Sequence, residues 1–288
     1  ALGLPIALAA AAGFIVAGLS AQGMPPYTLG YIYLQALAAI VVASTTGIMT
    51  PSLDAALIAT LGCDRRIARI PIFGLGCAAG VSGLARAADL CRGLGGRPVL
   101  FVAVEICSVT FQRGDASKAN IVGSSLFGDG AAAVLLAADG TGPAIAGHAG
   151  MLYPDTEDIM GWDVGDAGLR VRFSRDIPTF VRANIPALVA EACTGWNIEQ
   201  GAITDIIAHP GGAKVIDAYA EALGLPPERF RHATDVLRMY GNMSSASVLF
   251  VLERWLAEPR ADSAKPVGHA MMSALGPGFS AELLLLTG

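Results

Sequence analysis

Three polar residues, Cys77, His209 and Asn242, each stand among glycines at the end of a predicted strand or the start of a predicted helix. Cys77 lies in 72–80 (Ile-Phe-Gly-Leu-Gly-Cys-Ala-Ala-Gly), just before apolar residues that follow helical spacing from Val81 onward. Unpaired backbone N–H groups and the macrodipole at a helix N-terminus favour negative charge. This position predicts a thiol with a lowered pKa that acts as a nucleophile. The alternative interpretation is a buried structural cysteine.

His209 follows a predicted buried strand at 205–208, and Asn242 lies in a turn before a predicted helix. Strand ends and helix N-termini converge on ligand crevices in α/β sheets. A thiolate nucleophile, an imidazole partner and an amide that donates to an oxyanion together suit acyl transfer. Taken singly, such a histidine is more often structural and a Gly-Asn pair more often a simple turn. Papain-like proteases also use Cys, His and Asn, but their Cys-Gly-Ser-Cys-Trp signature is absent.

The composition limits the classes of protein to consider. The chain has 288 residues, is 53% hydrophobic and only 15% charged, and contains 35 glycines, which indicates a buried, layered α/β structure or some membrane contact. A net charge of −5 without a basic stripe excludes a general nucleic-acid binder. The five widely spaced cysteines and four unclustered histidines favour a cytoplasmic protein with free thiols and no metal site.

Apolar runs and helical periodicities alternate along the chain, which predicts an α/β fold with buried sheets. The predicted strands are 38–44, 98–105, 131–137, 205–208, 268–274 and 281–286. The predicted helices are 51–61, 81–94, 178–193, 215–223 (ended by Gly224) and one that runs to about 256 with Ser244 or Ser245 as its N-cap. Residues 114–123 are expected to be loop or briefly helical, and 138–170 to hold most of the irregular chain.

The N-terminal region is unusual because residues 1–53 contain no charged residue and no histidine. Residues 1–19 approach the length of about 20 apolar residues that spans a bilayer. Pro5 and several glycines weaken a spanning helix, and no basic flank marks a signal peptide. A buried strand and helix are therefore favoured over a membrane segment.

Six motifs in order make the sequence similar to a known family. They are Ser44-Thr45-Thr46-Gly47, Gly74–Gly80 around Cys77, Leu126-Phe127-Gly128-Asp129-Gly130, His209-Pro210-Gly211-Gly212, Gly241-Asn242-Met243-Ser244-Ser245 and Gly276-Pro277-Gly278-Phe279. Over 41–286 the chain resembles bacterial type III polyketide synthases of the chalcone/stilbene synthase family, within the thiolase-fold superfamily. The resemblance implies a thiolase-like layered αβαβα fold of two similar halves with buried mixed sheets. The halves would be 1–140, with the cysteine, and 141–288, with the histidine and asparagine.

The resemblance also implies a reaction. Cys77 would take a starter acyl group from coenzyme A as a thioester. His209 would keep Cys77 ionised and, with Asn242, hydrogen-bond the thioester carbonyl of malonyl-CoA, whose decarboxylation leaves an enolate that attacks the acyl-Cys77 thioester. Cyclisation would then give a pyrone, resorcinol, chalcone or related aromatic polyketide. The substrates would be acyl-CoA and malonyl-CoA, with no metal and no organic cofactor. The protein would be a homodimer in which 49–51 reaches the partner's cavity.

Further residues match substrate positions of the family. Phe127 corresponds to the aromatic gatekeeper between CoA tunnel and cavity, and Val171 to a second, here smaller, gatekeeper. The matched cavity-lining positions are Thr45, Glu105, Cys107, Thr110, Trp162 and Ser244, together with the loop Gly276-Pro277-Gly278. Lys214, with Gly211 and Gly212, matches positions at the CoA phosphates, and the alternative for Lys214 is a solvated helix lysine.

The resemblance departs from the family pattern near the N-terminus. Residues 14–29 resemble the family's opening strand and turn, but only 30–42 then separate it from the Thr-Thr-Gly motif, where the family has several charged helices. The N-terminal half is therefore expected to be shortened between about 30 and 40. Two alternatives stay open: a condensing enzyme like ketoacyl-ACP synthase III, which normally has His-Gln-Ala-Asn at 209–212, and a truncated, inactive or membrane-associated homologue.

Overall fold

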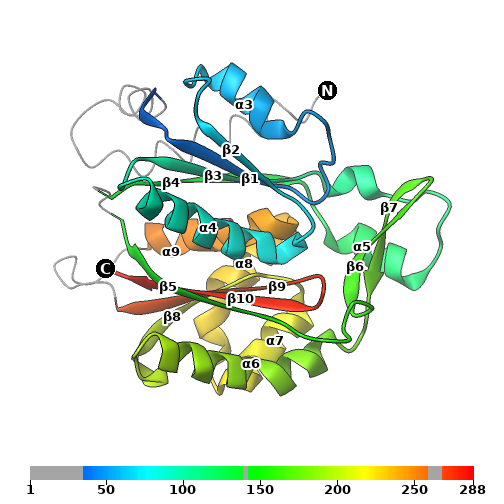
Figure 1. Ribbon diagram of the computed structural model, residues 1–288. Coiled ribbons are helices and arrows are strands. Elements are labelled where there is room, and N and C mark those ends of the chain that lie inside the picture. The colour runs from blue at the N-terminus through cyan, green and yellow to red at the C-terminus, as the bar shows by residue number, and fades with distance from the viewer. Residues whose placement is uncertain (1–34, 139–141, 259–267) are drawn as a thin grey trace.

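The computed structural model describes residues 35–138, 142–258 and 268–288, which form five layers (Figure 1). Helix α3 (Leu53–Leu61) covers a first sheet on its outer face. Helices α4 (Ala79–Gly93) and α9 (Ser247–Ala257) lie between that sheet and a second one. Helices α6 (Ile177–Gly195) and α7 (Ala213–Leu223) cover the second sheet from below in this view. The αβαβα arrangement confirms the predicted fold class.

The first sheet has the strand order β2-β1-β3-β4. Its strands are β1 (Ala39–Ala43), β2 (Ala68–Ile72), β3 (Val99–Glu105) and β4 (Gly130–Leu136). Strand β1 is parallel to β2 and β3, whereas β4 is antiparallel to β3, so the sheet is mixed. Strands β1 and β3 are buried along their whole length because helices cover both faces.

The second sheet has the order β5-β10-β9-β8 and is also mixed. Its strands are β5 (Ala144–Leu152), β8 (Ile203–Ala208), β9 (His269–Gly276) and β10 (Ser280–Thr287). Strand β8 runs parallel to β9, while β10 pairs antiparallel with both β9 and β5. One apolar cluster takes residues from both sheets and from the helices between and beneath them, among them Phe101, Leu84, Leu249, Leu284 and Ile185. The two sheets therefore share one core across the middle layer.

The structure differs from the sequence prediction in three regions. Residues 138–170, expected to be mostly irregular, hold β5 and most of a hairpin of β6 (Met160–Gly165) and β7 (Gly168–Phe173). Residues 118–126 form a full helix, α5, and an unpredicted helix, α8, spans Arg231–Tyr240. Edge strand β5 and the hairpin are largely solvent-exposed, so they lack the continuous apolar runs that mark a buried strand.

The expectations for residues 1–34, including the possible membrane segment and the resemblance over 14–29, lie outside the described residues, and the shortened region lies partly outside them. Within the residues that the structure describes, no helix is both long and apolar enough to cross a membrane. The predicted division at 140 stays a prediction.

Candidate active site

Cys77 sits in a single 3-10 turn, η2 (Gly76–Ala78), between β2 and α4. Gly76 has φ of +50°, a conformation that glycine adopts readily, and a Cβ there would lie 2.6 Å from Cδ of Pro277. The Gly76 N–H donates to Oγ1 of Thr45 over 3.0 Å, which ties the turn to the end of β1. The predicted helix after Cys77 is confirmed, since α4 begins at Ala79.

Asn242 lies in a second tight turn, between α8 and η6 (Ser244–Ala246). Its backbone N–H donates to the Leu126 carbonyl over 2.8 Å, and its own carbonyl accepts from Gly128 over 3.0 Å. The side-chain Oδ1 accepts from the Ser244 N–H over 2.8 Å, which fixes the orientation of the amide. The Nδ2 group therefore donates on the other side, to the Gly211 carbonyl 3.3 Å away.

The three predicted catalytic residues come from distant parts of the chain to one place. Cys77 Sγ lies 4.0 Å from Oδ1 of Asn242 and 3.7 Å from Oγ of Ser244. His209 follows β8, and its backbone N–H donates to Ser273 of β9 over 2.7 Å. It joins the group through Gly211, whose carbonyl accepts from Asn242.

Both ring nitrogens of His209 are buried, and neither has a hydrogen-bond partner among the described residues. An imidazole usually satisfies both nitrogens when it is buried. The unpaired imidazole is therefore an exception to this rule among the buried side chains that the structure describes.

Burial sets the protonation states of Cys77 and His209. Burial, reinforced by the nearby Glu105, raises the pKa of the Cys77 thiol to about 12, although hydrogen bonds to Ser244 and Asn242 oppose the rise. The expected lowering of the thiol pKa is therefore wrong, because loss of hydration outweighs the helix N-terminus. Burial likewise lowers the pKa of His209 to about 3. Thiol and imidazole are thus both neutral near pH 7 in the free protein, which contradicts the expectation that His209 keeps Cys77 ionised.

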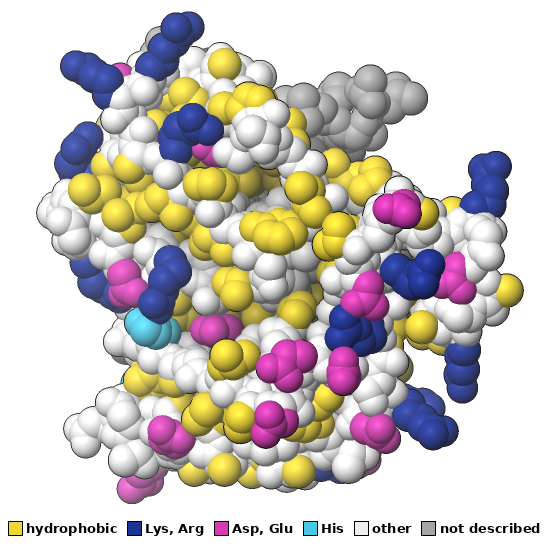
Figure 2. All heavy atoms as spheres, turned by 45° about the vertical axis from the view of Figure 1, so that its right-hand side comes forward, with side chains coloured by type: hydrophobic (Ala, Val, Ile, Leu, Met, Phe, Trp, Pro, Cys, Tyr) yellow, Lys and Arg dark blue, Asp and Glu magenta, His cyan; other side chains and the backbone are white. Residues whose placement is uncertain are grey.

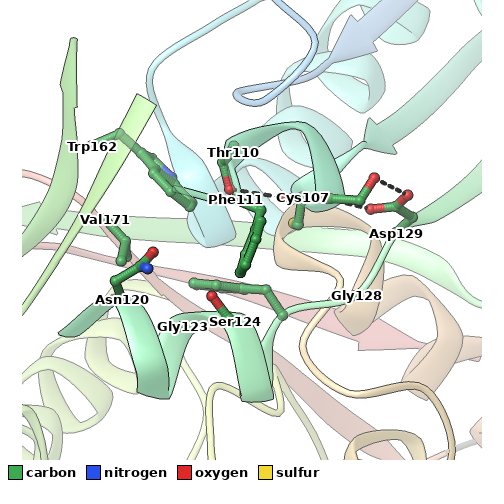
Figure 3. A pocket seen from close by; sticks show the side chains of 12 residues that line it. Cys107, Thr110, Phe111, Asn120, Gly123, Ser124, Gly128, Asp129, Trp162 and Val171 are labelled. Atoms are coloured by element: carbon green, nitrogen blue, oxygen red, sulfur yellow. Dashed lines mark hydrogen bonds between the residues drawn. The ribbon is translucent and has the colours of Figure 1, made fainter. Parts of the chain in front are cut away.

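A cavity of about 500 Å³ lies beside these residues (Figure 3). Trp162 and Val171 approach it from the β6–β7 hairpin, and Cys107 and Thr110 from η3 (Cys107–Thr110). Helix α5 closes it with Asn120, Gly123 and Ser124, and the remaining lining residues are Ser108, Phe111, Phe127, Gly128 and Asp129. Five of the predicted substrate residues therefore share one cavity: Cys107, Thr110, Phe127, Trp162 and Val171.

Phe127 stands between this cavity and Asn242. Its backbone forms an isolated bridge with Asn242, and its ring lies 5.6 Å from that of Trp162 and 5.5 Å from that of Phe173, measured between ring centroids. This position agrees with the gatekeeper role that the resemblance implies. Cys77, His209 and Asn242 themselves do not line the cavity.

Other predicted site residues lie behind the catalytic group. Thr45, Glu105 and Ser244 are buried and hydrogen-bonded to one another or to the Cys77 turn. The loop Gly276-Pro277-Gly278 packs against that turn, since a Cβ on Gly276 would lie 2.5 Å from the Leu75 carbonyl. Lys214 is exposed near the start of α7, close in sequence to Gly211 and Gly212. The substrate and CoA contacts of these residues stay predictions.

The sequence prediction missed several cavity residues, including Asn120, Phe111 and Asp129. Asn120 lies in the segment read as loop or short helix, so no periodicity marked its buried face. Asp129 stood within the Phe-Gly-Asp-Gly motif, which was the only available signal. It accepts from the N–H and hydroxyl of Ser108, both over 2.7 Å, and so fixes η3 at the cavity. No group of three or more potential metal ligands occurs among the described residues.

Comparison with known proteins agrees with this geometry. Models of the N-terminal and C-terminal domains of chalcone and stilbene synthases match residues 33–140 and 145–288. The chain belongs to the chalcone and stilbene synthase family. It is 43% identical over 258 residues to a putative chalcone synthase of Bacillus subtilis, covering 86% of this chain and 70% of that protein. It is 40% identical to 1,3,6,8-tetrahydroxynaphthalene synthase of Streptomyces peucetius, covering 86% and 66%.

Solved structures of type III polyketide synthases also resemble this chain. The crystal structure of 1,3,6,8-tetrahydroxynaphthalene synthase from Streptomyces coelicolor, a bacterial type III polyketide synthase, superposes with a TM-score of 0.87 at 30% identity, covering 99% of this chain and 79% of that one. A type III pentaketide synthase from Neurospora crassa gives a TM-score of 0.81 at 26% identity, covering 98% and 80%. The chain spans 65% to 70% of the length of the curated relatives that it matches.

Proposed function

We propose that this protein is a type III polyketide synthase that condenses an acyl-CoA starter with malonyl-CoA through a Cys77 thioester and cyclises the product. The observation that carries the proposal is the convergence of Cys77, Asn242 and the unpaired imidazole of His209 behind Phe127. Family membership supports the same chemistry. The proposal needs no metal and no organic cofactor beyond the CoA thioesters.

The first step is transfer of the starter acyl group to Cys77. His209 takes the thiol proton as the sulfur attacks the thioester carbonyl, and the CoA thiolate leaves as the new thioester forms. The thiol has a raised pKa in the free enzyme, so the proton moves during the attack rather than before it. Cys77 is 7% exposed, and this burial keeps bulk water away from the acyl-enzyme.

The second step is decarboxylation of malonyl-CoA. Loss of CO₂ leaves an enolate whose negative oxygen needs hydrogen-bond donors fixed in advance. Asn242 Nδ2 has two protons, of which the Gly211 carbonyl accepts one. The remaining proton and a protonated nitrogen of His209 supply two donors. The enolate carbon then attacks the carbonyl of the Cys77 thioester, the C–S bond to Cys77 breaks, and the leaving Cys77 thiolate takes back a proton from His209. The lengthened chain is now carried by CoA.

The cavity beyond Phe127 would hold the growing chain during cyclisation. Its lining combines aromatic rings, Trp162 and Phe111, with polar groups such as Asn120 and Ser124. Such a surface packs a flat, partly polar polyketide. Lys214 at the start of α7 would approach the CoA phosphates.

We also propose a cytoplasmic homodimer. Cys63, Cys77, Cys107 and Cys193 are free buried thiols, which suits a reducing compartment. Figure 2 shows hydrophobic side chains spread over the face beside the β6–β7 hairpin. Ile48, Met49 and Phe73 are exposed, and the second subunit would cover the segment at 49–51.

The direct test incubates the purified protein with radiolabelled malonyl-CoA and a panel of acyl-CoA starters, followed by chromatography and mass spectrometry of the products. We expect cyclised products of two or more condensations, together with a Cys77 peptide heavier by the starter acyl group. Cys77→Ala should abolish both signals. A single-condensation β-ketoacyl product formed only with an acyl carrier protein would replace the proposal by the ketoacyl-ACP synthase III alternative. Absence of acylation would support the inactive homologue.

A further inference from the structure

Glu105, the last residue of β3, is the most heavily hydrogen-bonded side chain in the centre of the molecule. It is 1% exposed. Its Oε2 accepts from the N–H groups of Thr45 and Thr46 over 3.2 and 3.0 Å and from the Thr46 hydroxyl over 2.6 Å. Its Oε1 accepts from the hydroxyls of Ser244 and Ser245 over 3.3 and 2.6 Å. No Lys or Arg of the described residues forms an ion pair with it.

The donors belong to two segments that each hold Cys77. Thr45, which binds Glu105 through its N–H, accepts the Gly76 N–H at its own Oγ1 and so fixes the turn that presents the thiol. Ser244 accepts from Cys77 Sγ at 3.7 Å while its hydroxyl donates to Glu105. Thr45 lies in the first half of the chain and Ser244 in the second, about 200 residues apart.

Ser244 also adopts a backbone conformation that needs support. Its φ is +48°, in the left-handed region that a residue with a side chain rarely adopts. Its hydroxyl bond to Glu105 and its N–H bond to Asn242 Oδ1 hold this conformation. Loss of Glu105 would therefore release Ser244 and, through it, the orientation of the Asn242 amide.

We propose that Glu105 is the positioning residue that holds the Cys77 turn and the Asn242–Ser244 turn in one fixed arrangement. This assigns it a role other than contact with substrate, since both of its oxygens are occupied by protein donors and it does not line the cavity. The inference deepens the proposed function and, for its kinetic part, rests on it. Its geometric part concerns the thiol alone.

Glu105 also leaves an electrostatic signature on Cys77. The Glu105 carboxylate opposes formation of a thiolate nearby and contributes to the raised pKa of Cys77. Burial also raises the pKa of Glu105 itself, and the hydrogen bonds from Ser245, Thr46 and Thr45 oppose that rise and favour its charged form. The other titratable groups of this cluster are Cys107, whose thiol interacts with that of Cys77, and His209, which reaches it through Gly211 and Asn242. Removal of the Glu105 charge should therefore make the Cys77 thiol more reactive. A shorter side chain at position 105 should make the enzyme slower, because it cannot reach all five donors.

Two substitutions separate the effect of the Glu105 charge from the effect of its side-chain length. Glu105→Gln keeps the length and removes the charge, and its NH₂ must face Ser244 and Ser245, whose hydroxyls can accept, rather than the two backbone N–H groups. We expect iodoacetamide to alkylate Cys77 roughly three to ten times faster at pH 8, measured by peptide mass spectrometry.

Glu105→Asp keeps the charge and shortens the side chain by about 1.5 Å. We expect no faster alkylation and a kcat for malonyl-CoA decarboxylation roughly 10 to 100 times lower with little change in KM.

Controls keep the test independent of folding and of the proposed reaction. Glu282→Gln alters a half-buried carboxylate on β10 and should leave Cys77 alkylation unchanged. Thr46→Val removes one donor to Glu105 and should lower kcat, whereas Thr46→Ser keeps the hydroxyl and should restore it. If both Glu105 variants only lower the melting temperature, with alkylation rate and kcat unchanged, Glu105 is structural and the inference is overturned. Alkylation does not need polyketide activity, so failure of the proposed function would leave this readout intact.

Discussion

At the scale of single residues, the site depends on buried polar groups whose protonation differs from that in water. Cys77 and His209 are both neutral near pH 7 because burial opposes the charged form of each. Asn242 has no such dependence, since an amide donates at any pH. The proposed catalytic residues are thus buried, uncharged in the free protein and held by neighbouring groups rather than by attraction between opposite charges.

His209 should make the stability of the protein fall with acid. In the folded chain the pKa of His209 is lowered from 6.5 to about 3. At a pH between these two values, the unfolded chain binds a proton at His209 and the folded chain does not. Stability is therefore lost as pH falls from about 6.5 towards 3, by about 2 kcal/mol at pH 5. Urea unfolding at pH 7.5 and pH 5.0 checks this. His209→Gln should remove that part of the loss. Equal losses in the variant and the wild type would contradict the prediction.

Asn242→Asp should abolish condensation without unfolding the protein. The carboxylate can still accept from the Ser244 N–H, but it offers no proton and faces the Gly211 carbonyl. Loss of one oxyanion donor costs about 100- to 1000-fold in kcat. Steady-state decarboxylation of malonyl-CoA measures the loss, and circular dichroism measures the fold. A variant with more than a tenth of wild-type kcat would remove Asn242 from the proposed mechanism.

At the scale of elements, close packing of helix α4 positions Cys77, the proposed nucleophile. A Cβ on Gly80 would lie 2.3 Å from the Ser245 carbonyl and 2.6 Å from Val248, so α4 approaches the start of α9 through a glycine. This contact places the Cys77 turn next to the turn that carries Asn242. Phe127, the proposed gatekeeper, is fixed in the same way, since a Cβ on Gly128 would lie 2.6 Å from the Tyr240 carbonyl.

Gly80 and Gly93, two of the three glycines of α4, should respond in opposite directions to alanine. Gly93→Ala meets nothing within 4 Å and should stabilise the protein by about 0.5 to 1 kcal/mol through helix propensity. Gly80→Ala should destabilise it by about 1 to 3 kcal/mol because the helix must move away from α9. Denaturant midpoints of the two variants provide the comparison. Stabilisation by Gly80→Ala would show that the contact with Ser245 is not tight.

At the scale of the whole molecule, the cavity forms only where three separate segments meet. Helix α5, turn η3 and the β6–β7 hairpin each supply part of its lining. Gln112 ties the segment after η3 to the hairpin, since its side-chain Nε2 donates to the carbonyls of Ala167 and Leu169 over 3.1 and 3.0 Å. The volume available for a growing chain is therefore set by how the hairpin packs, not by any one motif.

Val171→Phe should shorten the products. Val171 lines the cavity of about 500 Å³, and the larger ring takes up space that the growing chain would otherwise occupy. We expect fewer condensations or a preference for smaller starters, measured as the product distribution by mass spectrometry. Val164→Phe alters an exposed residue of the same hairpin and should leave the distribution unchanged. An unaltered distribution with Val171→Phe would place chain elongation elsewhere.

The sequence alone predicted most of the layered architecture, and it singled out Cys77, His209 and Asn242, whose catalytic roles stay a proposal. Buried strands such as 98–105 are continuous apolar runs in the sequence. Cys77, His209 and Asn242 stand in glycine-rich motifs that can be recognised without the structure. These signals are local, so periodicity and motif order suffice to find them. The exposed strand β5 and the β6–β7 hairpin lacked such a signal, because half-exposed strands mix polar and apolar residues.

Only the tertiary structure decided the electrostatics of the thiol and the role of Glu105. From sequence, Cys77 at a helix start predicted a lowered pKa, but the pKa depends on how much water the packed layers exclude, and that exclusion reversed its direction. Glu105 was expected at the cavity wall, yet its five donors come from segments at 45–46 and 244–245. Contacts between segments so distant in the chain exist only once both sheets pack around α4 and α9, so no local pattern records them.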